Sequence, residues 1–432
     1  MRKNTKFTTM NEKSLKSALI FILITICIDS IGVGIIIPSF PSLIAETAHV
    51  PMKESAIYFG WVMGIYAFMQ FLFSPLIGNL SDRFGRRPVL LISVFGMGLD
   101  FLVMYFAPDL FWLVLGRAIS GIFGASFTTA AAYISDVSTP ETTARNFGLI
   151  GAAFGIGFVI GPAIGGLLAD FGSRAPFLVA SAFSLLNFLF GFFVLKESLP
   201  KDQRRKFELK RSNPFGAFKQ MARFKELKYL FVVTFLVMLA NLAIHNTWNY
   251  FTMEKFLWSK KDVGYSLAFV GVCFGVVQGG LSGYFTRVLG EKKTAFIGLI
   301  TVIVVMVGIS LVPFGWMLYL VMLPYSFSGI IDPAIRTIVS TGTPQNEQGE
   351  LQGVFTSIMS LAEIIGPPFF MWIYATSRHE APTEWWGFGA PFLVASVIAA
   401  VAMFYLWWAL RNFKGVQKVN EVESPNSQVD EN

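Results

Sequence analysis

The chain has 432 residues, of which 54% are hydrophobic, 16% aromatic and only 14% charged. So little polar surface excludes a water-soluble protein of this length. The formal charge of +7 therefore does not belong to a soluble basic domain. This argues against a nucleic-acid partner and favours anionic lipid headgroups as the partner of the basic residues.

Apolar runs of membrane-spanning length follow one another along the chain. A spanning helix needs about 20 apolar residues, and runs that are continuous rather than alternating exclude a β-barrel. We therefore expect an all-α membrane protein of twelve transmembrane helices. The predicted spans are 18–38, 58–79, 88–107, 110–133, 147–169, 176–195, 229–251, 263–286, 294–313, 317–338, 349–374 and 390–410.

The longest polar interruption divides these runs into six plus six. Lys and Arg concentrate in both termini, in alternate loops and in this interruption, which predicts that both termini face the cytoplasm across an inner (cytoplasmic) membrane. The first run is too long for a cleavable signal and should remain as a helix. The expected segments are a cytoplasmic N-terminus (1–17), a first half (18–195), a central cytoplasmic loop (196–228), a second half (229–410) and a disordered cytoplasmic tail (411–432).

A dense charged loop stands between the second and third runs. It reads Gly78-Asn79-Leu80-Ser81-Asp82-Arg83-Phe84-Gly85-Arg86-Arg87-Pro88. A degenerate copy follows the eighth run, where Gly283 and Gly290 have the same spacing and precede Glu291-Lys292-Lys293. Internal repeats of this kind are typical of secondary transporters whose substrate site lies between the halves.

The charged loop resembles the signature loop of the major facilitator superfamily, which latches the cytoplasmic side of those transporters. The resemblance implies a gate made of Gly78, Asp82, Arg83, Gly85, Arg86 and Arg87, with Asp136 at the end of the fourth run. Gly78 would let another helix approach, and Asp82 would face a helix N-terminus. Arg86 would pair with Asp136. Ordinary cytoplasmic anchoring by arginines is the alternative.

The fifth run carries glycines at every fourth position. Gly157, Gly161 and Gly165, with Pro162 between them, form a smooth stripe for close helix packing. In the superfamily, this glycine and proline pattern is typical of drug–proton antiporters. A simple packing groove is compatible with both interpretations.

Residues from about 20 to 375 resemble the tetracycline–proton antiporters, in the expected order. The stretches that carry the resemblance include 28–34, 66–75, 78–90, 115–125, the glycine stripe, 251–252 and 347–367. The resemblance implies export driven by the proton gradient, with no bound cofactor. It also implies that Mg²⁺ enters only as part of a tetracycline chelate, the small-molecule substrate.

Ionisable residues inside the predicted spans are the first candidates for a site, because a charge at mid-helix costs about 2.5–3.5 kcal/mol on insertion scales. Asp29, Asp100 and Glu363 all lie near the middle of a run. Asp29 and Asp100 match acidic positions of the tetracycline family, although each could instead hydrogen-bond a neighbouring helix. Arg117 also matches the family and could pair with Asp100, because its permanent charge suits it to modulate a nearby acid.

Two positions depart from the family. Where better-known members carry a membrane histidine in helix eight and an acid in helix nine, this chain has Phe274 and Ile303. Protonation could be rerouted through Glu363, or tetracycline transport could be lost. Asp332 and Arg336 are four residues apart on one helix and could neutralise each other.

Polar and aromatic residues complete the predicted substrate cavity. They are Tyr66, Gln70, Asn241, Trp248 and Gln278. The two glutamines could bind substrate or each other across the halves. His245 has an ordinary pKa near 6.5 and could carry protons, although a lone membrane histidine is more often an interhelical donor.

Enzyme motifs for a metalloprotease, a serine hydrolase or an ATP-driven pump are absent from the sequence, so we expect a gradient-driven carrier rather than an enzyme. Cys27 and Cys273 are read as packing residues, and three scattered histidines give no metal site. One bundle contains the whole pathway, which predicts a monomer. The remaining alternatives are a metabolite symporter or uniporter, and a receptor on the same fold that no longer transports.

Overall fold

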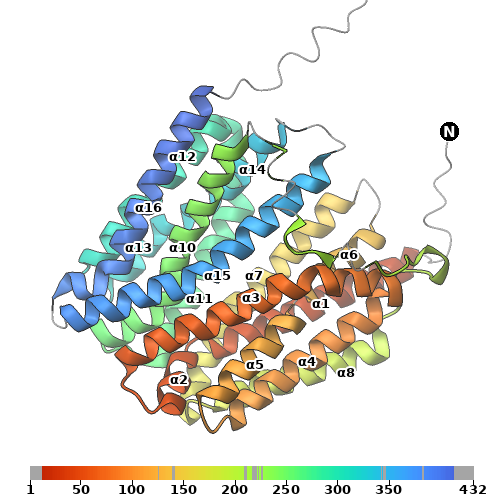
Figure 1. Cartoon of the computed structure of the whole chain (residues 1–432), viewed down its shortest axis with the longest axis horizontal. Helices are drawn as coiled ribbons and strands as arrows, with labels where there is room; N and C mark the ends of the chain where they lie inside the picture. The colour runs from red at the N-terminus through yellow and green to blue at the C-terminus, as the bar shows by residue number, and fades with distance from the viewer. Residues whose placement is uncertain are drawn as a thin grey trace, which may run out of the picture.

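The computed structural model describes residues 12–412 except for 125, 139–141, 209–211, 217–220, 222, 225–226, 342, 344–346 and 382–383. Residues 1–11 of the predicted N-terminal segment and residues 413–432 of the predicted tail lie outside the described part. What is described is helical, as predicted, and the helices form two bundles (Figure 1).

The first bundle contains the helices that precede the central loop. They are α1 (Glu12–Ile36), α2 (Phe40–Ala48), α3 (Met52–Phe84), α4 (Arg86–Phe106), α5 (Leu110–Phe123), α6 (Ser126–Asp136), α7 (Thr143–Leu168), the 3₁₀ turn η1 (Ala169–Phe171) and α8 (Ala175–Val194). In the described part of the central loop lies a 3₁₀ turn, η2 (Lys201–Gln203).

The second bundle follows that loop. It contains α10 (Lys228–Lys255), α11 (Lys260–Val276), the π-helical turn η5 (Val277–Leu281), α12 (Ser282–Leu311), α13 (Met317–Tyr325), the 3₁₀ segment η6 (Ser326–Ile330), α14 (Ile331–Thr341), α15 (Gln348–Glu380) and α16 (Trp385–Asn412).

Eleven helices in the described part are long and apolar enough to cross a membrane. The predicted eighth span is not among them because it is not one straight helix. It runs through α11 and η5 into the start of α12, and α12 continues into the ninth span across Gly290, whose φ of 77° and ψ of 161° are not helical. Gly279 and Gly280 within η5 explain the break, because glycine is a poor helix former.

The predicted glycine stripe of α7 packs against α1 inside the first bundle. A Cβ placed on Gly161 would lie 2.7 Å from Gly34 Cα, and one on Gly157 would lie 2.6 Å from the carbonyl oxygen of Cys27. Gly165 likewise meets the backbone of Ile35. Any larger side chain at these positions would push the two helices apart.

The two bundles meet mainly through α3 against α15 and α7 against α11. Gly64 leaves room for Pro368, since a Cβ there would lie 2.9 Å from the proline ring, and Gly166 lies similarly close to Gly264. Gly166 lies near the end of the molecule opposite the charged loop, which we name the far end, and Gly64 lies in the half of α3 nearer to it. The end that carries the loop 78–88 is named the loop end.

Hydrogen bonds between the bundles also join them at the far end. Ser55 Oγ of α3 lies 3.1 Å from the Tyr250 hydroxyl of α10, and the Asn249 amide donates to the Ile37 carbonyl at 2.6 Å. At the loop end the bundles diverge (Figure 1), and a Cβ on Gly78 would meet nothing within 4 Å. With the loop on the cytoplasmic side, as its arginines predict, this is an inward-facing arrangement.

Candidate functional site

A buried ion pair lies in the middle of the first bundle. Arg117 of α5 donates to the Asp100 carboxylate of α4, and the two residues are 5% and 1% exposed. Gly116 makes room for the pair, because a Cβ there would lie 2.8 Å from Asp100 Oδ1. The Arg117 guanidinium also lies 5.6 Å from the Phe40 ring and 5.5 Å from the Tyr66 ring. The pair considered from the sequence is thus present, and protonating Asp100 would leave a buried arginine without its counterion.

Asp29 is held by a residue that sequence reasoning missed. The Asn187 amide of α8 donates to Asp29 Oδ1 at 3.0 Å and to the Thr25 carbonyl at 3.2 Å. The only signal in the sequence was an amide inside an apolar run. Asp29 therefore hydrogen-bonds a neighbouring helix through one of its oxygens, as the alternative interpretation expected, on the side of α1 that faces α8.

Glu363 of α15 has neither a hydrogen bond nor an ion pair among the described residues, and its side chain is partly exposed. Four residues on, the Pro367 carbonyl faces α3, 3.0 Å from a Cβ placed on Gly60. Three residues on, Gly366 faces Leu242 of α10. Residues three and four positions apart flank one helix face, so Glu363 lies where α3, α10 and α15 meet.

Tyr66 of α3 connects this acid with the buried pair. Its ring lies beside Arg117, and its hydroxyl is within electrostatic reach of Arg117, Asp100 and Glu363. The structure therefore brings together four predicted residues, three from the first bundle and one from the second.

Three predicted cavity residues make their contacts within a single half. Trp248 is 2% exposed and donates to Ser266 Oγ at 2.9 Å inside the second bundle, so in this conformation it offers no stacking surface. Of the two roles expected for the glutamines, binding substrate or each other, the contact with each other does not occur in this structure. Gln70 donates to the Gly124 carbonyl at 3.1 Å in its own half, and Gln278 packs against Gly329 in the other.

Asn241 and His245 lie one turn apart on α10. Asn241 Oδ1 accepts from the Tyr325 hydroxyl at 3.0 Å, and Asn249, a further turn along, reaches the Ile37 carbonyl of α1. His245 lies between them on the same face and is exposed. It therefore does not pack in the interior of its own bundle.

The two departures from the tetracycline family are packed as apolar residues. The Phe274 ring lies 5.3 Å from the Tyr325 ring, and Ile303 packs against the main hydrophobic core. Neither position can bind a proton.

At the loop end, Arg86 is 8% exposed and surrounded by acceptors. Its guanidinium donates to Asp136 Oδ2 at 3.1 Å, as predicted, and to Asp82 Oδ1 and Ser81 Oγ, both at 2.6 Å. Asp82 thus pairs with Arg86 rather than facing a helix N-terminus, and Gly78 meets no other helix. Both expectations fail here because they concern contacts with the other half, which the open loop end does not provide.

Arg87 and Arg83, the other two arginines of the charged loop, make different contacts. Arg87 donates to the carbonyls of Leu195 and Phe192, both at 2.7 Å, so it caps the end of α8 rather than reaching into solvent. The Arg83 guanidinium lies 5.4 Å from the Phe84 ring.

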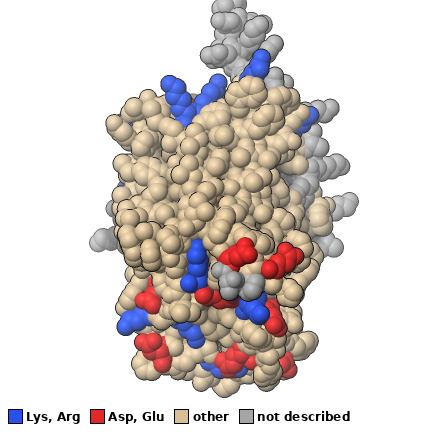
Figure 2. All heavy atoms as spheres, turned by 90° about the vertical axis from the view of Figure 1, so that its left-hand side faces the viewer, with Lys and Arg blue, Asp and Glu red and all other residues tan. Residues whose placement is uncertain are grey.

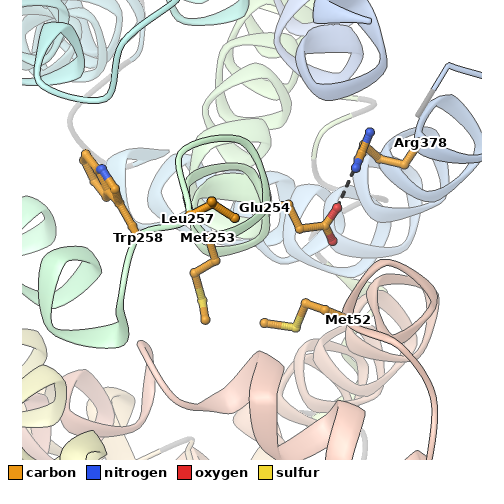
Figure 3. A pocket seen from close by; sticks show the side chains of 6 residues that line it. All are labelled: Met52, Met253, Glu254, Leu257, Trp258 and Arg378. Carbon is orange, nitrogen blue, oxygen red and sulfur yellow. Dashed lines mark hydrogen bonds and ion pairs between the residues drawn. The ribbon is translucent and has the colours of Figure 1, made fainter. Parts of the chain in front are cut away.

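A cavity of about 480 Å³ opens at the far end between the two bundles (Figure 3). Met52 of α3 lines one side, and Met253, Leu257 and Trp258 line the other. Its polar group is an ion pair at 3.0 Å between Glu254 of α10 and Arg378 of α15. Sequence reasoning missed this pair because charges at helix ends are ordinary. Figure 2 shows charged residues gathered toward this end and at the opposite edge, with a broad uncharged zone between them that suits lipid.

A family model for the Major Facilitator Superfamily matches residues 22–367. The chain belongs to this superfamily. It is a multi-pass membrane transporter and not an enzyme.

Curated relatives refine that placement. The class C tetracycline resistance protein of Escherichia coli is 37% identical over 361 residues, which cover 84% of this chain and 90% of the relative. The class B protein of Escherichia coli is 33% identical, covering 86% and 90%. Multidrug resistance protein 2 of Bacillus subtilis is 28% identical, covering 91% and 95%. The resemblance to tetracycline exporters drawn from the motifs is confirmed.

Solved structures agree on the fold. A bacterial homologue of the human lysosomal transporter Spinster superposes with a TM-score of 0.77 at 16% identity, covering 94% of this chain and 98% of that one. The nucleoside transporter NupG superposes with a TM-score of 0.74 at 14% identity, covering 93% and 100%.

Proposed function

We propose that this transporter exports a drug-like molecule in exchange for protons across the cytoplasmic membrane, working as a monomer, with a magnesium–tetracycline chelate as its first candidate substrate. The names of its relatives support tetracycline, and those relatives cover most of the chain. Phe274 and Ile303 leave the coupling groups of the better-known members without counterparts, so another group must carry the proton.

The observation that carries the proposal is the isolated carboxyl of Glu363. Asp100 is neutralised by Arg117, and Asp29 is hydrogen-bonded by Asn187. Glu363 has no such partner among the described residues and lies at the meeting of helices from both bundles. An acid at membrane depth without a counterion favours either a proton or a cation beside it.

The exchange of drug for proton follows from the competition between a cation and a proton for the Glu363 carboxylate. In the inward-facing arrangement a cationic drug, such as a positively charged metal chelate or a protonated amine, would take the place of the proton on Glu363. Closing the loop end and opening the far end would then release the drug outside, where a proton replaces it. Tyr66 would sense the change, because it interacts electrostatically with both Glu363 and the buried pair.

A metabolite carrier with altered coupling is the second candidate. The apolar side chains at Phe274 and Ile303 favour it, because they remove the family's usual proton groups. Such a carrier would move its substrate without the gradient dependence of an antiporter.

Transport in proteoliposomes tests the proposal by separating two reactions. Gradient-driven drug uptake needs a titrating group, whereas exchange of labelled for unlabelled drug does not. We expect Glu363→Gln to lose most gradient-driven uptake and to weaken exchange only in part, because the cationic drug loses the carboxylate but keeps its other contacts. Glu380→Gln is the matched control, because Glu380 is the last residue of the same helix and is exposed.

Loss of exchange in Glu363→Gln would instead make Glu363 essential for binding substrate. Unaltered gradient-driven uptake in this variant would contradict its role as proton carrier. Failure of every drug in active vesicles would favour the metabolite carrier.

A further inference from the structure

His245 is the one exposed side chain on a stretch of α10 that other helices otherwise enclose. Every other residue from 233 to 252 is buried or half-buried. Asn241 and Asn249, one turn to either side of His245, accept from a tyrosine hydroxyl of α13 and donate to a backbone carbonyl just beyond α1, respectively. A polar stripe of this kind at membrane depth is too costly to face lipid. The exposed imidazole therefore opens onto the space between the bundles.

Two contacts fix how α10 and α15 lie side by side. A Cβ placed on Gly366 of α15 would lie 3.0 Å from Leu242 Cβ of α10. Arg378 of α15 donates to Glu254 of α10, also at 3.0 Å. From the first contact to the second, both chains advance by twelve residues. The two helices are therefore parallel and in step.

This register gives the levels of His245 and Glu363. His245 lies three residues beyond Leu242, toward the far end, whereas Glu363 lies three residues before Gly366, toward the loop end. The two positions thus differ by a rise of six residues, or about 9 Å along the helix axes. A molecule of drug size can reach both side chains at once.

The far-end contacts between the halves begin at the level of His245. Met371 of α15 lies near this level, and its Cβ is 3.0 Å from a Cβ placed on Gly60 of α3. One turn further on, Asn249 reaches the Ile37 carbonyl at 2.6 Å. Toward the loop end the bundles diverge instead (Figure 1). His245 therefore lies at the inner end of the space that is open to the loop end, beyond Glu363.

The chemistry of this position differs from that of Glu363. An imidazole offers a hydrogen-bond donor and an acceptor, and His245 has no hydrogen-bond partner among the described residues. The neighbouring Asn241 amide is already used, because it donates to the Val237 carbonyl and accepts from Tyr325. The two exposed groups thus suit a molecule with a cationic centre at one end and a hydroxyl or carbonyl edge at the other.

We propose that His245 is a specificity-determining residue, which hydrogen-bonds an oxygen-bearing edge of the substrate while the substrate's cationic group lies at Glu363. This inference rests on the proposed function and names its substrate class, amphipathic cations with a hydroxyl or carbonyl edge about 9 Å from the charge. An oxygen-rich metal–tetracycline chelate belongs to this class. Cations without such an edge would bind through Glu363 and apolar contacts alone.

The location is tested by labelling His245→Cys in a chain whose Cys27 and Cys273 are replaced by serine. The water-soluble cation 2-(trimethylammonium)ethyl methanethiosulfonate is added to inside-out vesicles, so that it enters from the loop end. We expect rapid labelling of His245→Cys. Ile244→Cys is the matched control and should resist the reagent, because Ile244 is 4% exposed. Resistance of His245→Cys would overturn the location.

Equilibrium binding to the purified full chain tests the role. The probes are magnesium–tetracycline and tetraphenylphosphonium, a cation without any hydrogen-bonding group. We expect His245→Leu to weaken binding of the chelate by about two- to twelvefold, the range for one hydrogen bond, and to leave tetraphenylphosphonium unchanged or bound more tightly. His245→Gln should recover part of the loss. His379→Leu is the matched control, because His379 is exposed in the last turn of α15.

The outcomes separate this inference from the proposed function. Equal weakening of both probes in His245→Leu would make His245 a packing residue, and unchanged binding of both would also overturn its role. Glu363→Gln should weaken both probes, because both carry positive charge. That result together with an unchanged preference in His245→Leu would keep the proposed function and overturn this inference. Failure of the wild-type chain to bind either probe would overturn both.

Discussion

The charged loop 78–88 and its copy at 283–293 have the same backbone but different surroundings. Gly85 has φ 107° and ψ 158°, and Gly290 has φ 77° and ψ 161°, a conformation that is essentially reserved for glycine. A Cβ on Gly85 would collide with Glu197, whereas one on Gly290 would meet nothing within 4 Å. The repeat thus gives both halves the same turn, but only the first turn is enclosed by the central loop.

The charges around the two turns differ in the same way. Arg86 is buried and bound by Asp82 and Asp136. Its counterpart Glu291 and the neighbouring Lys292 have no ion pair among the described residues, and Lys292 is exposed. We conclude that the two halves share the turn but differ in its surroundings. Among the described residues, buried ion pairs enclose the turn of the first half and not that of the second.

Breaking the charges should show the largest difference. Arg86→Ala leaves Asp82 and Asp136 facing each other without their counterion, and we expect it to cost about 3 kcal/mol of folding free energy. Glu291→Ala, at the matching position of the copy, should change stability by less than about 0.5 kcal/mol. Thermal unfolding of the purified variants in detergent measures both. Similar costs at the two positions would contradict the asymmetry.

Breaking the turns should give a smaller difference. Gly290→Ala should lower the free energy of unfolding by about 1–3 kcal/mol, because alanine is strained in this backbone conformation. Gly85→Ala has the same backbone strain and also displaces Glu197 from the start of α4. The free energy of unfolding should therefore fall by about 1 kcal/mol more than in Gly290→Ala. The same unfolding assay applies, and adding Glu197→Ala to Gly85→Ala should cost little more, because the contact of Glu197 with α4 is already lost.

Removing the charge of Glu197, whose Oε1 accepts the backbone N–H of Arg86 at the start of α4, should have a modest effect. Glu197→Gln keeps the shape and one acceptor oxygen but loses the charge, which should cost about 1 kcal/mol. Glu291→Gln serves as the control at the copy. Proteolysis of the central loop in the native protein provides a second readout, and faster cleavage is expected only for Glu197→Gln.

The smallest expected effect is at the far end, where the contacts of Glu46 depend on pH. A hydrogen bond from Ser173, with the charges of Arg174 and of Lys260 in the other half, lowers the pKa of Glu46 despite its partial burial. A lowered pKa means that the stabilisation is complete above the ordinary carboxyl value of about 4.3 and is lost as pH falls through the lowered value. The accessibility of a cysteine introduced at Thr47, which is buried next to Glu46, should therefore rise in acid, and Glu46→Gln should show the raised accessibility at every pH.

Much of the fold was predictable because it depends on hydrophobic length and charge placement. The all-α class, the repeated loop and the glycine stripe of α7 followed from local patterns. Close spacing also predicted Asp332 with Arg336, which pair at 2.7 Å.

The rest depended on contacts between distant segments and on how each helix is rotated. Asn187 and Asp29 are 158 residues apart, and Glu197 and Arg86 are 111 apart. No spacing in the sequence indicates either contact. Trp248 was misplaced for a related reason, because an aromatic residue in an apolar helix can face lipid, cavity or core, and only packing decides which.

Substrate-triggered proton movement tests the central claim most directly. Inside-out vesicles are energised to an acidic interior, and magnesium–tetracycline and a panel of amphipathic cationic drugs are then added. We predict that a transported drug releases protons from the wild-type vesicles and that Glu363→Gln abolishes the release. Drug uptake without any proton movement, or full release in Glu363→Gln, would contradict proton exchange through this acid.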